Sequence, residues 1–248
     1  MRNSEKDAAE MSAKREIMLE TGFRIFAENV IESVSMNDIA KACNLGIATL
    51  YRYFSTKLDF VIAIGTRQWE DYYAEIETEY RNLNGENMTA SQEFEFYLDS
   101  YITLYRKHKD ILRFNRNFDT YVRHEGATSE QMRPYNEAVN AFARKFHTVY
   151  EKAENDGTLR TDIPEERLFV SAMYTMLSVS AKYAEGLIYP SNSENDMTEE
   201  LQFLKDIILN AYITEKGRSY HESKAGSPDD SSRTRSGSSC CERWVRRQ

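Results

Sequence analysis

SMNDIAKACNLGIATLYRYFSTK, residues 35–57, contains two short helical patterns separated by a turn. Small and apolar residues recur at steps of three and four over residues 36–43, which predicts a two-turn helix with Ser35 as its N-cap. Residues 44–46 form a turn, and residues 47–54 predict a second short helix. Two short helices joined by such a turn match the helix-turn-helix, whose second helix enters the major groove of DNA.

The helical period continues on both sides of this unit. Residues 11–28 predict an amphipathic helix that ends near Asn29, a residue type that tolerates a left-handed C-cap. Residues 57–80 predict a long helix capped by residues 55–56, and no alternating strand pattern is present. Further helices are expected at residues 91–108, 109–123, 130–156, 165–189 and 197–215. The expected fold is therefore all-α, with an N-terminal three-helix DNA-binding domain and a C-terminal helical bundle.

Composition excludes several classes of protein. The 41% hydrophobic content argues against a disordered chain, and 10 Gly and 4 Pro are too few for a collagen-like or turn-rich chain. The three cysteines supply neither a disulfide framework nor a zinc site, so we expect a reducing compartment. No long uninterrupted apolar stretch and no leader pattern are present, which predicts a cytoplasmic protein with no membrane partner.

Charge is distributed unevenly. Residues 1–60 carry a net charge of −1, residues 61–216 carry −10 and residues 217–248 carry +3. The acidic middle cannot face a polyanion, so any contact with nucleic acid has to use cations of the N-terminal part. The last segment is rich in Ser, Arg, Gly and Asp and is predicted to be a disordered tail.

The common enzyme motifs are missing from the sequence. It contains no GxGxxG, P-loop, GxSxG or HExxH pattern, and none of its four histidines follows a Glu by three residues. We therefore expect no enzyme activity, no cofactor and no metal. Cys43 fits the helix period as a small core residue, with a redox switch as the alternative.

Residues 15–57 resemble the DNA-binding domain of the TetR (tetracycline-repressor) family, and the LYRYF-x-x-K part is its specific signature. The matching residues are Ser35, Asp38, Ile39, Ala40, Ala42, Leu45, Thr49, Leu50, Tyr51, Arg52, Tyr53, Phe54 and Lys57. Asn44 stands where the family has its turn glycine, Val30 replaces the glycine after the first helix, and Gly46-Ile47 replaces a polar pair. The resemblance implies a dimeric, ligand-responsive transcriptional repressor that binds a pseudo-palindromic operator.

The expected DNA-binding residues lie on the two short helices and their caps. They are Ser35, Asn37, Gly46, Ile47, Ala48, Thr49, Tyr51, Arg52, Tyr53 and Lys57. Tyr51, Tyr53 and Lys57 are assigned to phosphates, and Thr49 with Arg52 to the groove. Two interpretations of Ile47 remain open. Its spacing from Leu50 predicts an inward side chain, whereas the resemblance implies that it faces DNA.

The aromatic-rich middle of the chain is the expected effector and dimerisation domain. The candidate effector residues are Tyr97, Tyr101, Phe114, Phe118, Tyr121, Phe146, His147, Tyr174 and Ser178. For each aromatic residue taken singly, core packing is the competing interpretation. Helices 165–189 and 197–215 are expected to form a four-helix dimer interface. Their expected contact residues are Ala172, Ser178, Ala181, Leu201, Leu204, Ile208 and Ala211.

These patterns divide the chain into four parts. The DNA-binding domain is expected at 11–57, a connecting helix at 58–80, the effector-binding and dimerisation domain at 81–216 and the disordered tail at 217–248. Two other classes remain open at this level: a helical small-molecule enzyme or binding protein, and a protein-interaction module.

Overall fold

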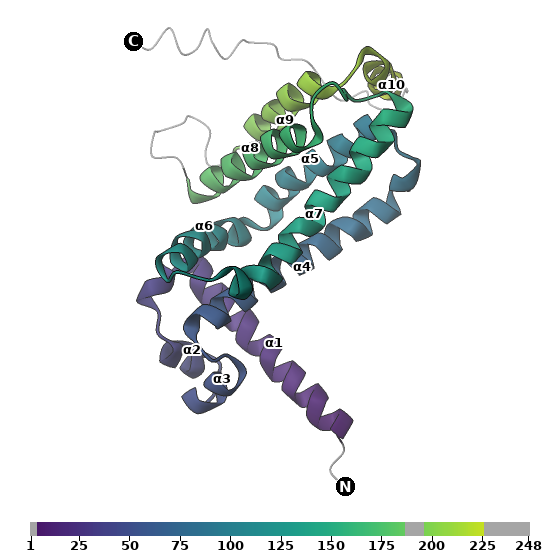
Figure 1. Cartoon of the computed structure of the whole chain (residues 1–248). Coiled ribbons are helices and arrows are strands. Elements are labelled where there is room, and N and C mark those ends of the chain that lie inside the picture. Colours follow the sequence, from purple (N-terminus) through teal and green to yellow (C-terminus); the bar gives the residue numbers. More distant parts are fainter. Residues whose placement is uncertain (1–3, 187–195, 226–248) are drawn as a thin grey trace, which may run out of the picture.

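The computed structural model describes residues 4–186 and 196–225, and nearly all of them are helical (Figure 1). The helices are α1 (Ser4–Glu28), α2 (Met36–Ala42), α3 (Ile47–Tyr53), α4 (Lys57–Asn82), α5 (Ala90–Lys107), α6 (Lys109–His124), α7 (Ser129–Asp156), α8 (Glu165–Glu185), α9 (Thr198–Tyr212) and α10 (Glu215–Ala225). Two short 3₁₀ helices, η1 (Ile31–Ser33) and η2 (Gly85–Asn87), join α1 to α2 and α4 to α5. The all-α prediction is confirmed.

Several predicted helix ends differ from the structure: α1 begins at Ser4 and not at residue 11, α8 ends at Glu185 and not at residue 189, and α9 ends at Tyr212 and not at residue 215. Asn29 is not left-handed: its side-chain amide donates a hydrogen bond back to the carbonyl of Ile25 at 2.9 Å, and the chain continues into η1. At the other end of the chain, residues 217–225 belong to α10, although the sequence predicted disorder from residue 217. Gly217 of this helix lies close to the Thr158 carbonyl oxygen, where a Cβ atom would come within 2.3 Å. Residues 226–248 of the predicted tail lie outside the described residues.

Local capping explains where four of the helices begin. Ser35, Thr56, Thr89 and Thr128 each accept a hydrogen bond from the backbone N–H three residues on. The residue at that position, Asp or Gln, accepts one from the backbone N–H of the cap in return. This reciprocal pair satisfies two N–H groups that a helix start otherwise leaves unpaired.

α1, α2, α3 and the start of α4 enclose one end of the continuous hydrophobic core, called the small core below (lower part of Figure 1). Phe60 of α4 is fully buried at its centre, with ring centroids 6.1 Å from Phe26 and 4.8 Å from Phe54. α4 then runs out of this core into the larger bundle, where it packs along α7 (Figure 1). One helix therefore belongs to both the small core and the bundle.

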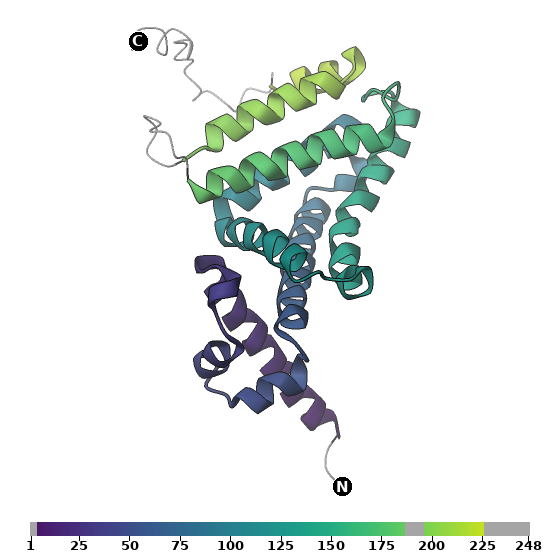
Figure 2. The same ribbon diagram turned by 60° about the vertical axis from the view of Figure 1, so that its left-hand side comes forward.

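The larger bundle contains α4 to α9 and is held by aromatic side chains. α5 lies against α7, α8 and α9, while α6 lies between α8 and the end of α1 (Figure 2). Phe118 and Tyr135 stack with ring centroids 4.4 Å apart, and Phe94, Tyr97 and Phe146 form a second group. Of the described helices, none is long and apolar enough to cross a membrane.

α8 and α9 each bury one face in the chain and expose another. Ala172, Leu201 and Ile208, which the sequence assigned to a dimer interface, are buried within the chain because α9 packs on α5 and α8. Different apolar residues are exposed on these two helices: Val170, Tyr174, Phe203 and Ile207. Tyr174 is 61% and Phe203 is 68% exposed. Of the other residues that the sequence assigned to the interface, Ser178 and Ala211 are exposed, and Ala181 and Leu204 are half-buried. An apolar surface therefore exists on the predicted helices, and its large exposed side chains are not among the residues that the sequence assigned.

Gly22 fits the ring of Phe60. A Cβ atom on Gly22 would lie 2.5 Å from Cζ of Phe60, whose side chain is fully buried and cannot swing away. We expect Gly22→Ala to lower the free energy of unfolding by about 1 kcal/mol, since overpacking costs about 1–3 kcal/mol and the helix preference of Ala returns only about 0.5–1 kcal/mol. Urea unfolding measures this. In a Phe60→Leu background the same substitution should cost less, with only the contact at 2.8 Å to Cδ1 of Ile64 remaining, and an equal loss in both backgrounds would contradict this packing.

Candidate nucleic-acid interface

The first short helix, α2, starts at an exposed serine. The hydroxyl of Ser35 accepts a hydrogen bond from the N–H of Asp38 at 3.2 Å, and the N–H of Ser35 donates to Oδ2 of Asp38 at 3.0 Å. The hydrogen bonds from Ser35 lower the pKa of the Asp38 carboxyl. Ser35 and Asn37 are both exposed, so the start of α2 is accessible to a ligand such as a phosphate.

The turn between α2 and α3 depends on Asn44. Its φ of 55° lies in the left-handed region, which Asn enters more readily than other residues with a Cβ atom. The N–H of Leu45 reaches back to the carbonyl of Ala40 at 2.8 Å and closes the end of α2. The predicted helix-turn-helix is therefore present, with Asn in place of the glycine.

The inner face of α3 attaches the helix to the protein. Leu50 is fully buried and Phe54 nearly so, against α1 and the Phe60 ring. Burying each of these side chains stabilises the unit by about 1.5–3 kcal/mol. Because α3 has only seven residues, too few to be helical alone in water, this burial sets both its existence and its orientation.

The outer face of α3 is formed by two pairs of neighbouring residues, one helical turn apart. Ile47, Ala48, Tyr51 and Arg52 are exposed, with Ile47 at 36% and Tyr51 at 48%. Ile47 therefore points outward, and the inward reading from its spacing to Leu50 is wrong. Gly46, the N-cap of α3, is exposed as well and has no side chain to obstruct an approaching surface.

Two residues assigned to DNA lie on the flank of α3 and not on its outer face. Thr49 and Tyr53, four residues apart, are both half-buried. The guanidinium of Arg52 lies 5.8 Å from the centroid of the Tyr53 ring, within the range of a cation–π contact. Arg52 and Tyr53 therefore form one cationic and aromatic group at the end of α3.

Lys57 was assigned to a phosphate, but in the structure its ammonium has partners inside the protein. Nζ donates to the carbonyl of Ile31 at 2.5 Å and lies 5.3 Å from the ring centroid of Tyr121. Burial lowers the pKa of Lys57, and the carboxylates of Glu32 and Glu125 partly oppose that shift. A phosphate contact by Lys57 therefore requires its ammonium to leave these partners.

Cations of α1 also lie beside α3, which the sequence patterns did not indicate. The guanidinium of Arg15 is 5.5 Å from the Phe54 ring centroid. Lys14 interacts electrostatically with Arg52 and Tyr53, and its hydrogen bond with Glu10 raises its pKa. These contacts join residues that are far apart in the sequence, so no local pattern could have revealed them.

The candidate effector residues separate into two groups. Tyr97, Tyr101, Phe114, Phe118, Tyr121 and Phe146 are buried in the aromatic core, as the core-packing interpretation expected. His147, Tyr174 and Ser178 are exposed on α7 and α8. These three residues therefore do not belong to the buried aromatic group. His147 instead pairs with Glu165 at 2.9 Å, which raises the pKa of its imidazole.

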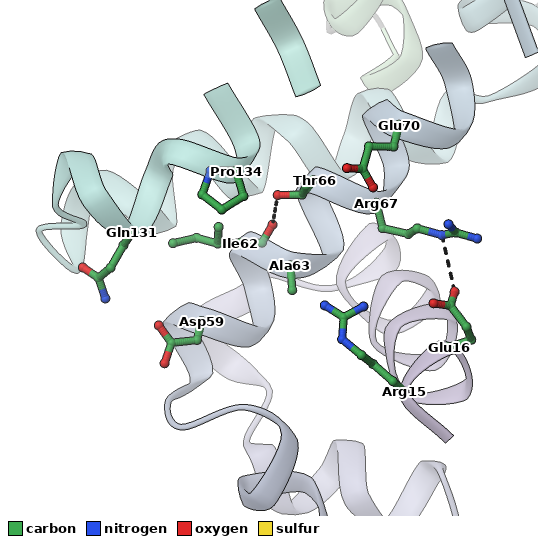
Figure 3. A pocket seen from close by; sticks show the side chains of 10 residues that line it. All are labelled: Arg15, Glu16, Asp59, Ile62, Ala63, Thr66, Arg67, Glu70, Gln131 and Pro134. Atoms are coloured by element: carbon green, nitrogen blue, oxygen red, sulfur yellow. Dashed lines mark hydrogen bonds and ion pairs between the residues drawn. The ribbon is translucent and has the colours of Figure 1, made fainter. Parts of the chain in front are cut away.

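A groove of about 380 Å³ lies between α1, α4 and α7 (Figure 3). It is lined by Arg15, Glu16, Asp59, Ile62, Ala63, Thr66, Arg67, Glu70, Gln131 and Pro134. Arg67 pairs with Glu16 at 3.4 Å and Thr66 donates to the Ile62 carbonyl at 2.9 Å, as the dashed lines show. This mixed-charge groove contains none of the candidate effector residues.

The fold and this surface define a helix-turn-helix DNA-binding protein, and comparison with known proteins agrees. Residues 18–64 match the family described as bacterial regulatory proteins, tetR family. An HTH-type transcriptional regulator of Staphylococcus aureus (strain USA300) is 22% identical over 216 residues, 86% of this chain and 98% of that protein. Another, from strain MSSA476, is 32% identical over 100 residues, 38% of this chain and 52% of that protein.

Solved structures share the fold over about four fifths of this chain. A transcriptional regulator from Saccharomonospora viridis in complex with choline has a TM-score of 0.65 and 18% identity, covering 82% of this chain and 100% of that one. The transcriptional regulator FadR of Bacillus subtilis in complex with stearoyl-CoA has a TM-score of 0.59 and 15% identity, covering 79% and 95%. Residues 18–64 are therefore similar to the DNA-binding part of the tetR family, and most of the chain is similar to HTH-type transcriptional regulators. The protein is a DNA-binding transcriptional regulator.

The turn offers a direct test of its backbone geometry. Asn44→Ala should lower the free energy of unfolding by about 1 kcal/mol, because a residue with a Cβ atom and no local hydrogen bonding is disfavoured at this positive φ. Asn44→Gly should be neutral or stabilising, since glycine adopts the same φ without strain. Both variants are compared by urea unfolding. If Asn44→Gly lost as much stability as Asn44→Ala, the side chain and not the backbone would explain Asn44.

Proposed function

We propose that the protein is a homodimeric, ligand-responsive repressor that binds a pseudo-palindromic operator. The outer face of α3 carries this proposal: a short helix fixed by Leu50 and Phe54 exposes Ile47, Ala48 and Tyr51. A side chain set of this size can reach base edges and phosphates when the helix enters a major groove. The proposed domain division is the N-terminal unit at 11–57, the connecting helix at 58–80 and the bundle at 81–216.

Roles within the DNA-binding unit follow from exposure. Asn37 at the start of α2, with Tyr51 and Tyr53 of α3, is proposed to bind phosphates, since amide and hydroxyl groups donate to phosphate oxygens. Ser35 is proposed to bind a phosphate only if its N–H or hydroxyl leaves the Asp38 carboxylate, to which both donate. Ile47, Ala48 and Arg52 are proposed to face the groove, with Thr49 at its edge. Gly46 permits close approach of the backbone. Lys57 is proposed to reach a phosphate only after it leaves Ile31.

Dimerisation is proposed through the exposed apolar face of α8 and α9. Val170 and Tyr174 are one turn apart on α8, as Phe203 and Ile207 are on α9, and the two helices pack side by side. Large apolar side chains clustered on a surface mark an interaction site. A dimer with two-fold symmetry would bury this apolar surface on both copies at once. Two recognition helices related by that axis would read half-sites whose centres lie about 10 base pairs apart or a multiple of that.

Phe203→Glu should make the protein monomeric and weaken operator binding by more than tenfold, because it places a charge in the proposed apolar interface. Light scattering gives the mass and a gel shift gives the affinity. Leu83→Glu is the matched control, since Leu83 is 53% exposed at the end of α4, away from α8 and α9. A Phe203→Glu protein that remained dimeric would exclude this interface.

Ligand control is proposed to act through the aromatic interior of the bundle. Four polar atoms of the bundle are buried without a hydrogen-bond partner in the described part of the chain: the hydroxyl of Tyr97, Nδ2 of Asn115, Oγ of Ser180 and Oε1 of Glu77. Such groups cost about 1–3 kcal/mol each when unpaired, so a bound molecule that supplied partners would gain that energy. Two structural neighbours are complexes with small molecules, stearoyl-CoA and choline, which supports the proposal that this protein responds to a ligand.

An effector should stabilise the protein and weaken operator binding without dissociating the dimer. The physical reason is that a ligand shifts the protein toward a state that it binds better, and α4 links the bundle to the DNA-binding unit. Apolar and aromatic compounds are screened by thermal shift, and each hit is then tested by gel shift. Ligands that raise the melting temperature but never change DNA affinity would contradict ligand control.

A further inference from the structure

α6 contacts the DNA-binding unit at the point where α1 ends and α4 begins. Figure 2 shows α6 lying next to the C-terminal end of α1. Lys57, the first residue of α4, donates to the carbonyl of Ile31 at 2.5 Å, and its ammonium lies 5.3 Å from the ring centroid of Tyr121 on α6. One cation therefore joins three elements: η1, α4 and α6.

A second contact crosses the same junction without involving this cation. Nδ2 of Asn117, one turn before Tyr121 on α6, donates to the carbonyls of Phe26 at 3.4 Å and Asn29 at 3.3 Å. These carbonyls belong to the last turn of α1 and the residue after it, where a helix leaves acceptors unpaired. Asn117 therefore provides a comparison for the cation contact: it has the same location and a different chemistry.

The position of Lys57 is unfavourable apart from these contacts. A cation at the first residue of a helix opposes the partial positive charge of the helix start. Burial also disfavours its charge, so its pKa is lowered, and only Glu32 and Glu125 oppose that change. The carbonyl of Ile31 and the ring of Tyr121 thus offset a cost that a phosphate would relieve more strongly, because a phosphate carries a full negative charge.

We propose that Tyr121 of α6 and a DNA phosphate compete for the ammonium of Lys57. Without DNA, the Tyr121 ring and the Ile31 carbonyl hold the ammonium inside the junction. On the operator it turns to a phosphate, and α6 loses this contact with the DNA-binding unit. Tyr121 is then a positioning residue for DNA binding, with no contact of its own to DNA. This inference rests on the proposed phosphate role of Lys57.

The contact between Tyr121 and Lys57 therefore lowers the affinity for DNA, and the bundle controls how strongly it does so. Any movement of α6 that brings Tyr121 closer to Lys57 strengthens the DNA-free state, and any movement away releases a phosphate-binding cation. Ile31 lies four residues before Ser35, so the same junction also borders the start of α2. The contact therefore acts on the part of the unit that is proposed to bind phosphates.

The test compares Tyr121→Leu with Tyr121→Phe in the full-length protein. Leu removes the ring, so affinity for operator and for random DNA should rise together by about two- to fivefold, which is the range expected for a partly exposed cation–π contact. Phe keeps the ring and should behave as the wild type. If a folded Tyr121→Leu protein bound DNA with unchanged or lower affinity, the proposed competition would be wrong.

Two further variants separate the competition from simple loosening of the junction. In a Lys57→Ala background, Tyr121→Leu should have no effect on affinity, because the contested cation is gone. Asn117→Ala removes the other junction contact and should not raise affinity. An equal gain from Asn117→Ala, or an undiminished gain in the Lys57→Ala background, would show that loosening and not Lys57 is responsible, and would overturn the inference.

Failure of the proposed function is distinguishable from failure of this inference. Lys57→Ala alone should reduce the salt dependence of DNA binding by about one unit for each Lys57 that binds a phosphate. An unchanged salt dependence would reject the phosphate role itself. A reduced salt dependence combined with no effect of Tyr121→Leu would reject only the competition.

If Tyr121→Leu does not fold, the wild-type protein still provides a test. NMR of the lysine side chains, with Lys57 assigned through Lys57→Arg, should show a ring-current shift of its ε-methylene signal without DNA. Addition of operator DNA should return that signal to the usual lysine position. A signal that keeps its shift in the complex would mean that Lys57 stays with Tyr121, and the competition would be excluded.

Discussion

Burial of the inner face of α3 is the interaction on which the DNA-binding surface depends. Seven residues cannot sustain a helix in water, so α3 exists because Leu50 and Phe54 insert into the core of α1 and α4. Phe60 lies under Phe54 and beside Phe26, and Gly22 leaves the space for its ring. The residues proposed to face DNA are therefore held in place by buried residues of the core.

The same core connects recognition to the rest of the chain. α4 contributes Phe60 to the small core and then continues along α7 in the bundle, so a tilt of α4 moves both parts. α6 provides a separate connection through Asn117 and Lys57 at the end of α1. With two connections at different points, the bundle can set the orientation of the DNA-binding unit and not only its distance.

Local chemistry made much of this predictable from the sequence. Ser35 with Asp38, the left-handed Asn44 and the spacing of Leu50 and Phe54 act within a few residues, so the helix-turn-helix could be predicted with its boundaries. Packing between distant segments decided the rest. Tyr121 contacts Lys57, which lies 64 positions earlier in the chain. The faces of α8 and α9 that are buried are those that pack on α5, and the periodicity within those two helices does not show which face that is.

The central claim is that two copies of α3, related by a two-fold axis, read the operator. Footprinting of the wild-type protein on the DNA upstream of its own gene, at stated salt, tests this most directly. The account predicts two protected segments related by a pseudo-palindrome, with centres about 10 base pairs apart or a multiple of that. A single protected segment without two-fold symmetry, or uniform protection of any sequence, would contradict it.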